Sequence, residues 1–347
     1  MNRGIMFALA SAMLFGISTP LAKALVATTS PLLLAGLLYA GSGFGLALVM
    51  AIRRVSTRGS SASVPGVEEW RSLAAAIFFG GLLGPAALMY GLVTSAASIA
   101  SLLLNLEAVF TALLAWFLFR ENFDRRIALG MAAIVAGGAL LVWVPGQRAG
   151  ASLGLLLIIA ACFCWALDNN LTRKVSASDA VVVACAKGLV AGAVNIGLAL
   201  LLGAKLPTLA ALGDAMSVGF FGYGVSLVLF VLALRHLGAA RTSAYFSVAP
   251  FFGAALSLLL VGDPITWQLA FAGLLMATGV WLHLTERHEH LHRHAPQEHT
   301  HPHVHDEHHQ HSHHSWDGAE PHTHTHRHAP IVHAHPHYPD LHHRHPH

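Results

Sequence analysis

The sequence predicts an all-α integral membrane protein. Ten transmembrane helices form two inverted five-helix repeats, and a disordered histidine-rich tail follows them. Three observations support this fold class. Of the 347 residues, 55% are hydrophobic and only 11% are Asp, Glu, Lys or Arg, whereas soluble proteins carry roughly 25% charged residues. The apolar residues gather in long runs, and 24 of the 26 histidines lie after residue 287. Two regions of different composition therefore meet near residue 287.

Ten apolar segments are each long enough to cross a bilayer, which takes about 20 helical residues. In chain order they are 4–26, 31–52, 72–93, 97–118, 127–144, 152–171, 180–202, 210–234, 239–261 and 265–284. Glycine recurs in them, for example at Gly80-Gly81 and Gly137-Gly138, as expected where membrane helices approach closely. The period-two alternation of membrane strands is absent from the sequence, so helices are predicted throughout.

The basic residues between these segments predict the orientation. Counting from an internal N-terminus, the connections on the inner side carry eleven Lys or Arg residues, and those on the outer side carry only Arg148 and Lys205. Because Lys and Arg are retained in cytoplasmic loops, we expect a multi-pass protein of a bacterial inner membrane. Both termini and the tail are then cytoplasmic. The lipid bilayer is the expected partner of the body, and a nucleic-acid partner is not expected.

The apolar body also repeats itself. Phe78-Phe79-Gly80 returns 142 residues later as Phe220-Phe221-Gly222. The sequence therefore predicts three domains: a first five-helix repeat at 1–148, a second at 149–287, and the tail at 288–347. An odd number of spans in each half makes the second half enter the membrane from the opposite side. Inverted repeats are typical of membrane transporters, with the substrate near the midplane between the halves.

Several segments resemble a known family. They are Leu14–Lys23, Ser98–Trp116 with its continuation to Gly130, Cys164–Leu167, and Ala239–Pro250 with its continuation to Gly273. In order, spacing and duplication they resemble the EamA-type two-domain transporters of the drug/metabolite transporter superfamily, over residues 4–284. The resemblance implies ten helices and carrier-type export or exchange of small solutes, without fixing the substrate.

The chain departs from this family at two places. The family usually has a proline midway along its fourth helix, where this chain has Glu107-Ala108; the second half keeps Pro250. The acid that usually opens the last helix is Asp263, which is shorter than the common Glu.

Glu107 is the most informative single residue, because it falls near the centre of an apolar segment. An isolated acid there costs about 2.5–3.5 kcal/mol on insertion scales, so it must be protonated, paired or facing a polar cavity. We predict a proton- or cation-coupling site; the alternative is a structural acid bonded to a neighbouring helix. Asn105, about 200° away around the same helix, is expected to bond another helix.

Further polar residues complete the predicted transport set. Asp168 and Asn169 lie toward the inner end of the sixth segment, and Lys187 lies in the seventh. Lys187 is either the counter-charge of Glu107 or Asp168 or an interfacial lysine. Cys164, four residues before Asp168, either packs or joins it as a metal ligand. The predicted transport and coupling residues are Glu107, Asp168, Lys187, Asn105 and Asn169.

The tail alternates histidine with other residues over sixty positions, a composition typical of disordered metal-binding segments. Neutral imidazole binds Ni, Co and Zn well. The predicted ligands are His288, His290, His292, His294, His299, His301, His303, His305, His322, His324, His326 and His328. The tail could serve transport, store metal, sense metal, or be a tolerated extension.

The leading prediction from sequence is a proton-coupled secondary transporter that exports divalent transition-metal cations, Ni or Co, with Zn as a further candidate. The alternative is an exporter of a small organic metabolite or drug, with the tail as a metal buffer or sensor. No cofactor is required, and an enzyme is not expected, because the loops between segments are too short to build a catalytic site. The sequence leaves open whether the protein is a monomer or a homodimer.

Overall fold

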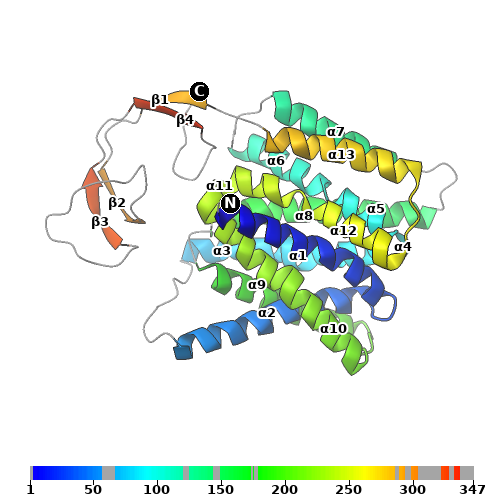
Figure 1. Cartoon of the computed structure of the whole chain (residues 1–347). Coiled ribbons are helices and arrows are strands. Elements are labelled where there is room, and N and C mark those ends of the chain that lie inside the picture. Colours follow the sequence, from blue (N-terminus) through cyan, green and yellow to red (C-terminus); the bar gives the residue numbers. More distant parts are fainter. Residues whose placement is uncertain are drawn as a thin grey trace. The chain divides into compact units, whose positions relative to one another are not determined.

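The computed structural model describes residues 3–56, 67–119, 125–143, 149–172, 175, 179–285, 289–293, 298–303, 322–327 and 332–336 (Figure 1). The chain divides into a helical unit, Met1–Glu286 with Pro339–His347, and a second unit, Arg287–Tyr338.

The described part of the helical unit contains ten helices long and apolar enough to cross a membrane, which confirms the predicted fold class. The first half contains α1 (Arg3–Val26), α2 (Pro31–Ser56), α3 (Val67–Ala76), η1 (Ile77–Leu83), α4 (Gly84–Thr94), α5 (Ala97–Leu103), α6 (Leu106–Phe119) and α7 (Arg125–Val142). The second half contains α8 (Ala149–Thr172), α9 (Ala180–Leu201), α10 (Leu209–Gly219), η3 (Phe220–Val225), α11 (Ser226–Phe246), α12 (Ala249–Leu256), η4 (Ser257–Val261) and α13 (Trp267–Leu284).

The two halves meet along glycine-lined helix pairs. Gly188 of α9 lies so close to α2 that a Cβ built on it would collide with the backbone nitrogen of Gly43. Helices α7 and α13 run side by side (Figure 1), and a Cβ on Gly137 would lie 2.8 Å from Met276 Cγ. These contacts fit the expectation that small residues let membrane helices approach.

Two of the three described π-helical segments, η1 and η3, occur at related positions of the halves. η1 contains Phe78-Phe79-Gly80 and η3 contains Phe220-Phe221-Gly222, the segment that the sequence repeats. A Cβ on Gly80 would collide with Asp168, and one on Gly222 would lie 2.6 Å from Ser18 Cβ. Because π-helical turns are rare and frequent at functional sites, their duplication points to the region between them.

Two spans are broken at related positions. In the fourth span, α5 ends at Leu103 and α6 begins at Leu106; in the ninth, α11 ends at Phe246 and α12 begins at Ala249. Pro250 accounts for the second break because proline has no backbone N–H to donate. The first break persists without a proline, and it leaves Glu107 in the first turn of α6. Broken helices are a common way to build a transporter's binding site.

The tail unit differs from the predicted disordered segment at four short places. β1 (Glu289–Arg293) pairs antiparallel with β4 (Val332–Pro336), and β2 (Glu298–His303) pairs with β3 (His322–Arg327). The period-two alternation of these segments is compatible with paired strands. Of the predicted metal ligands, His288, His294, His305 and His328 lie outside the described residues, and metal binding by the tail stays a prediction.

Candidate functional site

A central cavity of about 80 Å³ lies between the two halves. It is lined by residues of α1, α2 and α6 from the first half, and of α8, α9, η3 and α11 from the second. The lining residues are Phe15, Tyr39, Ser42, Glu107, Trp165, Asp168, Asn169, Ala184, Lys187, Gly188, Gly222, Tyr223, Ser226, Leu227, Phe230 and Phe246. Four of the five residues predicted for transport therefore surround one space.

A buried ion pair forms one wall of this cavity. Lys187 Nζ of α9 lies 2.6 Å from Asp168 Oδ1 and 2.7 Å from Asp168 Oδ2 of α8. Thr172, one turn after Asp168, donates its hydroxyl to Oδ1 at 2.8 Å. Of the two partners that the sequence allows for Lys187, the structure places Asp168 against it. Both charges are buried, and each is compensated by the other.

Glu107 has a different environment. Its Oε1 accepts a hydrogen bond of 2.7 Å from Asn169 Nδ2, and its side chain is only half-buried because it faces the cavity. Within the described residues Glu107 forms no ion pair. Its position in the first turn of α6 favours a negative charge, since backbone N–H groups there point toward the helix start. Glu107 is therefore held by a neutral amide and can meet a cation or a proton from the cavity.

Aromatic rings enclose the polar residues. Phe15 lies 5.8 Å from Trp165, 5.8 Å from Tyr223 and 5.5 Å from Phe246 between ring centroids. Tyr39 lies 5.4 Å from Tyr223. From the sequence alone, Tyr90, Tyr223 and Trp165 could line a pore or simply pack, and Phe15, Tyr39 and Phe246 carry no such signal. Phe15 and Trp165 lie 150 residues apart, the offset that relates the first helices of the halves, and this could have identified Phe15.

The widened turn of η1 fixes two of these rings. Tyr39 donates its hydroxyl to the carbonyl of Gly80 at 2.6 Å, and Trp165 donates Nε1 to the same oxygen at 3.0 Å. The next carbonyl, of Gly81, accepts from Asn195 Nδ2 at 3.0 Å. One π-helical segment thus positions both rings and lies against Asp168.

Asn105 is the predicted transport residue that lies elsewhere. Its Nδ2 donates to the carbonyl of Leu102 at 3.1 Å and contacts Met276 Sδ of α13 at 3.8 Å, and it is not among the cavity residues. The contact with α13 is the bond to another helix that the sequence predicts, but Asn105 lies in the break between α5 and α6 and not on the opposite face of one helix from Glu107.

The described residues offer no group of three or more His, Cys, Asp or Glu side chains that could hold a metal ion. Cys164, the metal ligand considered beside Asp168, is absent from the lining of the central cavity. Around the cavity, the chemistry consists of carboxylate, ammonium, amide, hydroxyl and aromatic groups.

Within the described residues, ten membrane spans in two repeat-related halves surround a central cavity lined by charged and aromatic side chains, and this arrangement defines a multi-pass membrane transporter. The model of the EamA-like transporter family matches residues 2–143 and 152–285, so the chain belongs to this family, as the sequence resemblance predicts.

Two curated relatives and one solved structure show how far the similarity extends. An "Uncharacterized transporter" of Methanothermobacter thermautotrophicus is 28% identical over 77% of this chain and 82% of its own length. A "Probable amino-acid metabolite efflux pump" of Salmonella typhimurium is 30% identical over 52% of this chain and 65% of its own length. A solved structure named only "Crystal structure of protein" aligns with a TM-score of 0.60 and 18% identity, over 80% of this chain and 95% of that one. This last similarity concerns the fold alone.

Proposed function

We propose that the protein is a secondary carrier that exports a small organic metabolite carrying an amino group, of the amino-acid type. This is the alternative that the sequence left open, and it replaces the metal cation as the preferred substrate. The observation that carries it is the central cavity, where Glu107, unpaired within the described residues, faces an aromatic enclosure. A carboxylate suits a substrate ammonium group, and aromatic faces suit apolar groups and cations. The similarity to the Salmonella relative, named as a probable amino-acid metabolite efflux pump, supports the same class.

Glu107 is proposed to couple export to protons. A carboxylate held by the neutral amide of Asn169 can bind either a proton or a substrate ammonium group, and the two compete for the same oxygens. Asp168 is already neutralised by Lys187, so this acid is proposed to keep its charge through the cycle. Exchange of one proton for one solute at Glu107 gives antiport.

The cycle needs the halves to move. At about 80 Å³ the cavity is smaller than the roughly 300–1,000 Å³ typical of small-molecule sites. Solute entry therefore requires α1, α8, α9 and α11 to separate around it. With both termini cytoplasmic, as the basic residues predict, rocking of the halves opens the cavity to each side in turn.

Metal export remains the second candidate, favoured by the histidine content of residues 288–347. In this version the tail collects Ni, Co or Zn at the inner side. The membrane body provides less support, because its described residues contain no metal-ligand cluster. With an organic substrate, the tail instead buffers or senses metal and no cofactor is required.

Solute accumulation in inside-out vesicles tests the two candidates together. Vesicles with an acidic lumen and the full chain are offered radiolabelled L-phenylalanine, or Ni²⁺, as the probe. We expect accumulation of phenylalanine that collapses with the proton gradient and is lost in Glu107→Gln. Asp214→Asn, which removes an exposed acid of α10, is the matched control and should transport normally. Gradient-driven accumulation of Ni²⁺ without phenylalanine would contradict the proposal.

A further inference from the structure

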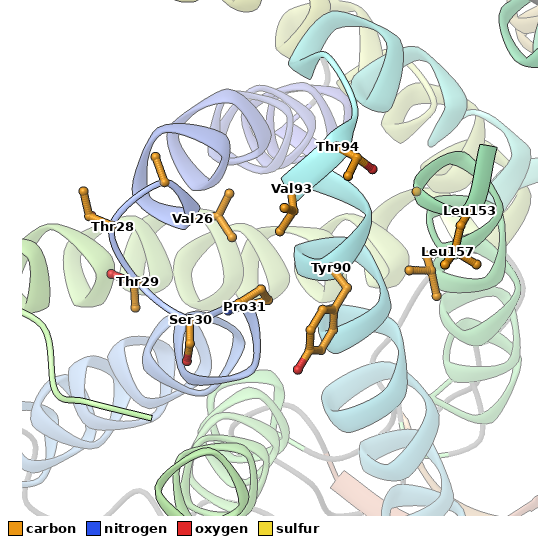
Figure 2. A pocket seen from close by; sticks show the side chains of 12 residues that line it. Val26, Thr28, Thr29, Ser30, Pro31, Tyr90, Val93, Thr94, Leu153 and Leu157 are labelled. Atoms are coloured by element: carbon orange, nitrogen blue, oxygen red, sulfur yellow. The ribbon is translucent and has the colours of Figure 1, made fainter. Parts of the chain in front are cut away.

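A second, larger cavity of about 610 Å³ lies away from the central one (Figure 2). Its lining comes from the connection between α1 and α2, from the end of α4 and from the beginning of α8. Figure 2 shows Thr29 of the connection, Pro31 at the start of α2, Tyr90 and Val93 of α4, and Leu157 of α8. The spans alternate in direction, so this is the end that carries the connections after spans one, three, five, seven and nine. We call it the Thr29 end.

The cavity contains hydrogen-bonding groups that the described residues leave without a partner. Thr29 is buried, with 5% of its surface exposed, and its hydroxyl has no partner. The buried hydroxyl oxygen of Ser30, the next residue, also has none. Buried polar atoms are nearly always hydrogen-bonded, so two adjacent orphan hydroxyls in the wall of a cavity indicate a missing polar partner.

The rest of the lining is mostly apolar, with the hydroxyl groups of Thr28, Thr94 and Tyr90 as its polar groups. The described residues around the cavity include no Asp, Glu, Lys or Arg, and Tyr90 is the single aromatic ring among them. This lining does not suit a bare metal ion, which needs charged or imidazole ligands. It suits an organic molecule with an apolar portion and a group that accepts or donates hydrogen bonds. The volume lies within the range of small-molecule sites.

The two cavities lie along the same helices. From Pro31 to Tyr39 on α2, and from Leu157 to Trp165 on α8, the separation is eight residues, or about 12 Å of helix. Leu88 and Leu92 of α4 and Ile158 of α8 occupy the intervening turns and are fully buried. A Cβ on Gly91 would lie 2.6 Å from Ile158 Cγ1, so α4 and α8 pack directly against each other beside the second cavity.

We propose that the cavity at the Thr29 end is a second solute subsite on the export path. After solute leaves the central cavity, Tyr90 contacts its apolar part, and the buried hydroxyls of Thr29 and Ser30 rotate toward the cavity and bind its polar group. The layer of Leu88, Leu92 and Ile158 separates the two positions. This inference rests on the proposed export of an organic solute, and it adds where the solute binds outside the central cavity.

Protection of an introduced thiol tests the subsite. The full chain carries Ser30→Cys together with Cys164→Ser, because Cys164 is the half-exposed native thiol and Cys162 and Cys185 are buried. A membrane-impermeant maleimide labels it in proteoliposomes with and without L-phenylalanine. Leu206→Cys, exposed in the connection between α9 and α10 at the same end, is the matched control outside the cavity.

We expect phenylalanine at about ten times its Kd to slow labelling at Ser30→Cys by about tenfold, because protection follows the occupied fraction of the site, and to leave Leu206→Cys unchanged. Adding Tyr90→Ala should abolish the protection, whereas adding Trp267→Ala, an exposed aromatic outside the cavity, should not. Adding Glu107→Gln should preserve it, because the subsite does not use that carboxylate.

Three results would overturn the subsite: unchanged labelling at Ser30→Cys, equal slowing at Leu206→Cys, or loss of protection in Glu107→Gln. The last would mean that the central site moves the loop from a distance. Transport without protection overturns the subsite and leaves the proposed function standing. Protection without transport overturns the function and leaves the subsite standing.

Discussion

Lys187 donates to both carboxylate oxygens of Asp168, at 2.6 and 2.7 Å, and so joins α9 to α8 inside the membrane body. The pair lies against the π-helical turn of η1, since a Cβ on Gly80 would collide with Asp168 Oδ2. The same turn holds Tyr39 and Trp165 through the Gly80 carbonyl. One charge pair thereby fixes one wall of the cavity, and Glu107, bonded to the neighbouring Asn169, is the cavity acid that forms no ion pair among the described residues.

The Asp168–Lys187 pair predicts non-additive effects on stability. The two side chains are 8% and 4% exposed, and removing one partner of such a pair costs about 3–5 kcal/mol because the other charge remains buried. We expect Asp168→Asn and Lys187→Met each to lower the thermal midpoint in detergent. The double variant should lose much less than the sum. Additive losses would show that the pair is not coupled.

The close packing around Gly80 predicts that a larger side chain there disturbs the cavity, and Gly197 provides a matched control. Gly80→Ala places a methyl group on the Asp168 carboxylate, whereas Gly197→Ala on α9 meets nothing within 4 Å. We expect Gly80→Ala to abolish phenylalanine transport and lower stability. Gly197→Ala should be neutral or stabilising by up to about 1 kcal/mol, the helix preference of alanine over glycine. Transport and thermal midpoints of the two purified variants decide this, and similar behaviour of both would refute the role of Gly80.

Asp263 forms a contact between the two halves at the Thr29 end. Its Oδ2 accepts from the backbone nitrogen of Ser98 at 2.7 Å, so a residue of the second half caps α5 of the first. Lys23 donates to the carbonyl of Leu92 at the end of α4 and interacts electrostatically with Asp263. Because losing a capping carboxylate costs about 0.5–2 kcal/mol, Asp263→Ala should speed amide hydrogen exchange in 97–103.

A local cap provides the control for Asp263. Asp179 Oδ1 accepts from the backbone nitrogen of Val181 at 2.8 Å and caps its own helix, α9. We expect Asp179→Ala to speed exchange near 180–183 only, and Asp263→Ala also to change the transport rate. If Asp263→Ala leaves α5 exchange at the wild-type level, the contact does not hold the halves together.

The histidine tail predicts pH-dependent metal binding separate from transport. Imidazole binds metal in its neutral form and protonates with an ordinary pKa near 6.5. The full chain should therefore bind several Ni²⁺ ions at pH 7.5 and lose them below about pH 6. A chain ended at Arg287 should bind far less Ni²⁺ and transport phenylalanine at an unchanged rate. Equal Ni²⁺ binding by both chains, measured by calorimetry, would exclude the tail as the ligand.

The membrane spans and the charged candidates were accessible from the sequence, because hydropathy reports burial in lipid residue by residue. The partners of these charged residues could not be predicted from the sequence. Asp168 and Lys187 lie on different spans, and whether they meet depends on how α8 packs on α9. The break before Glu107 also escaped prediction, because Leu104-Asn105 contains neither proline nor glycine. Phe15 and Tyr39 read as ordinary apolar positions until the fold brings them to one cavity. The paired strands of the tail were not predicted, because the composition of the tail provides no hydrophobic core.

Proton movement on addition of solute tests the central claim most directly. Proteoliposomes with the full chain and a pH-sensitive dye in the lumen receive L-phenylalanine outside. Antiport through Glu107 predicts that solute entry drives protons out and makes the lumen alkaline, that Glu107→Gln abolishes the signal, and that Ni²⁺ produces none. An undiminished signal in Glu107→Gln, or a signal with Ni²⁺ and none with phenylalanine, would contradict the account.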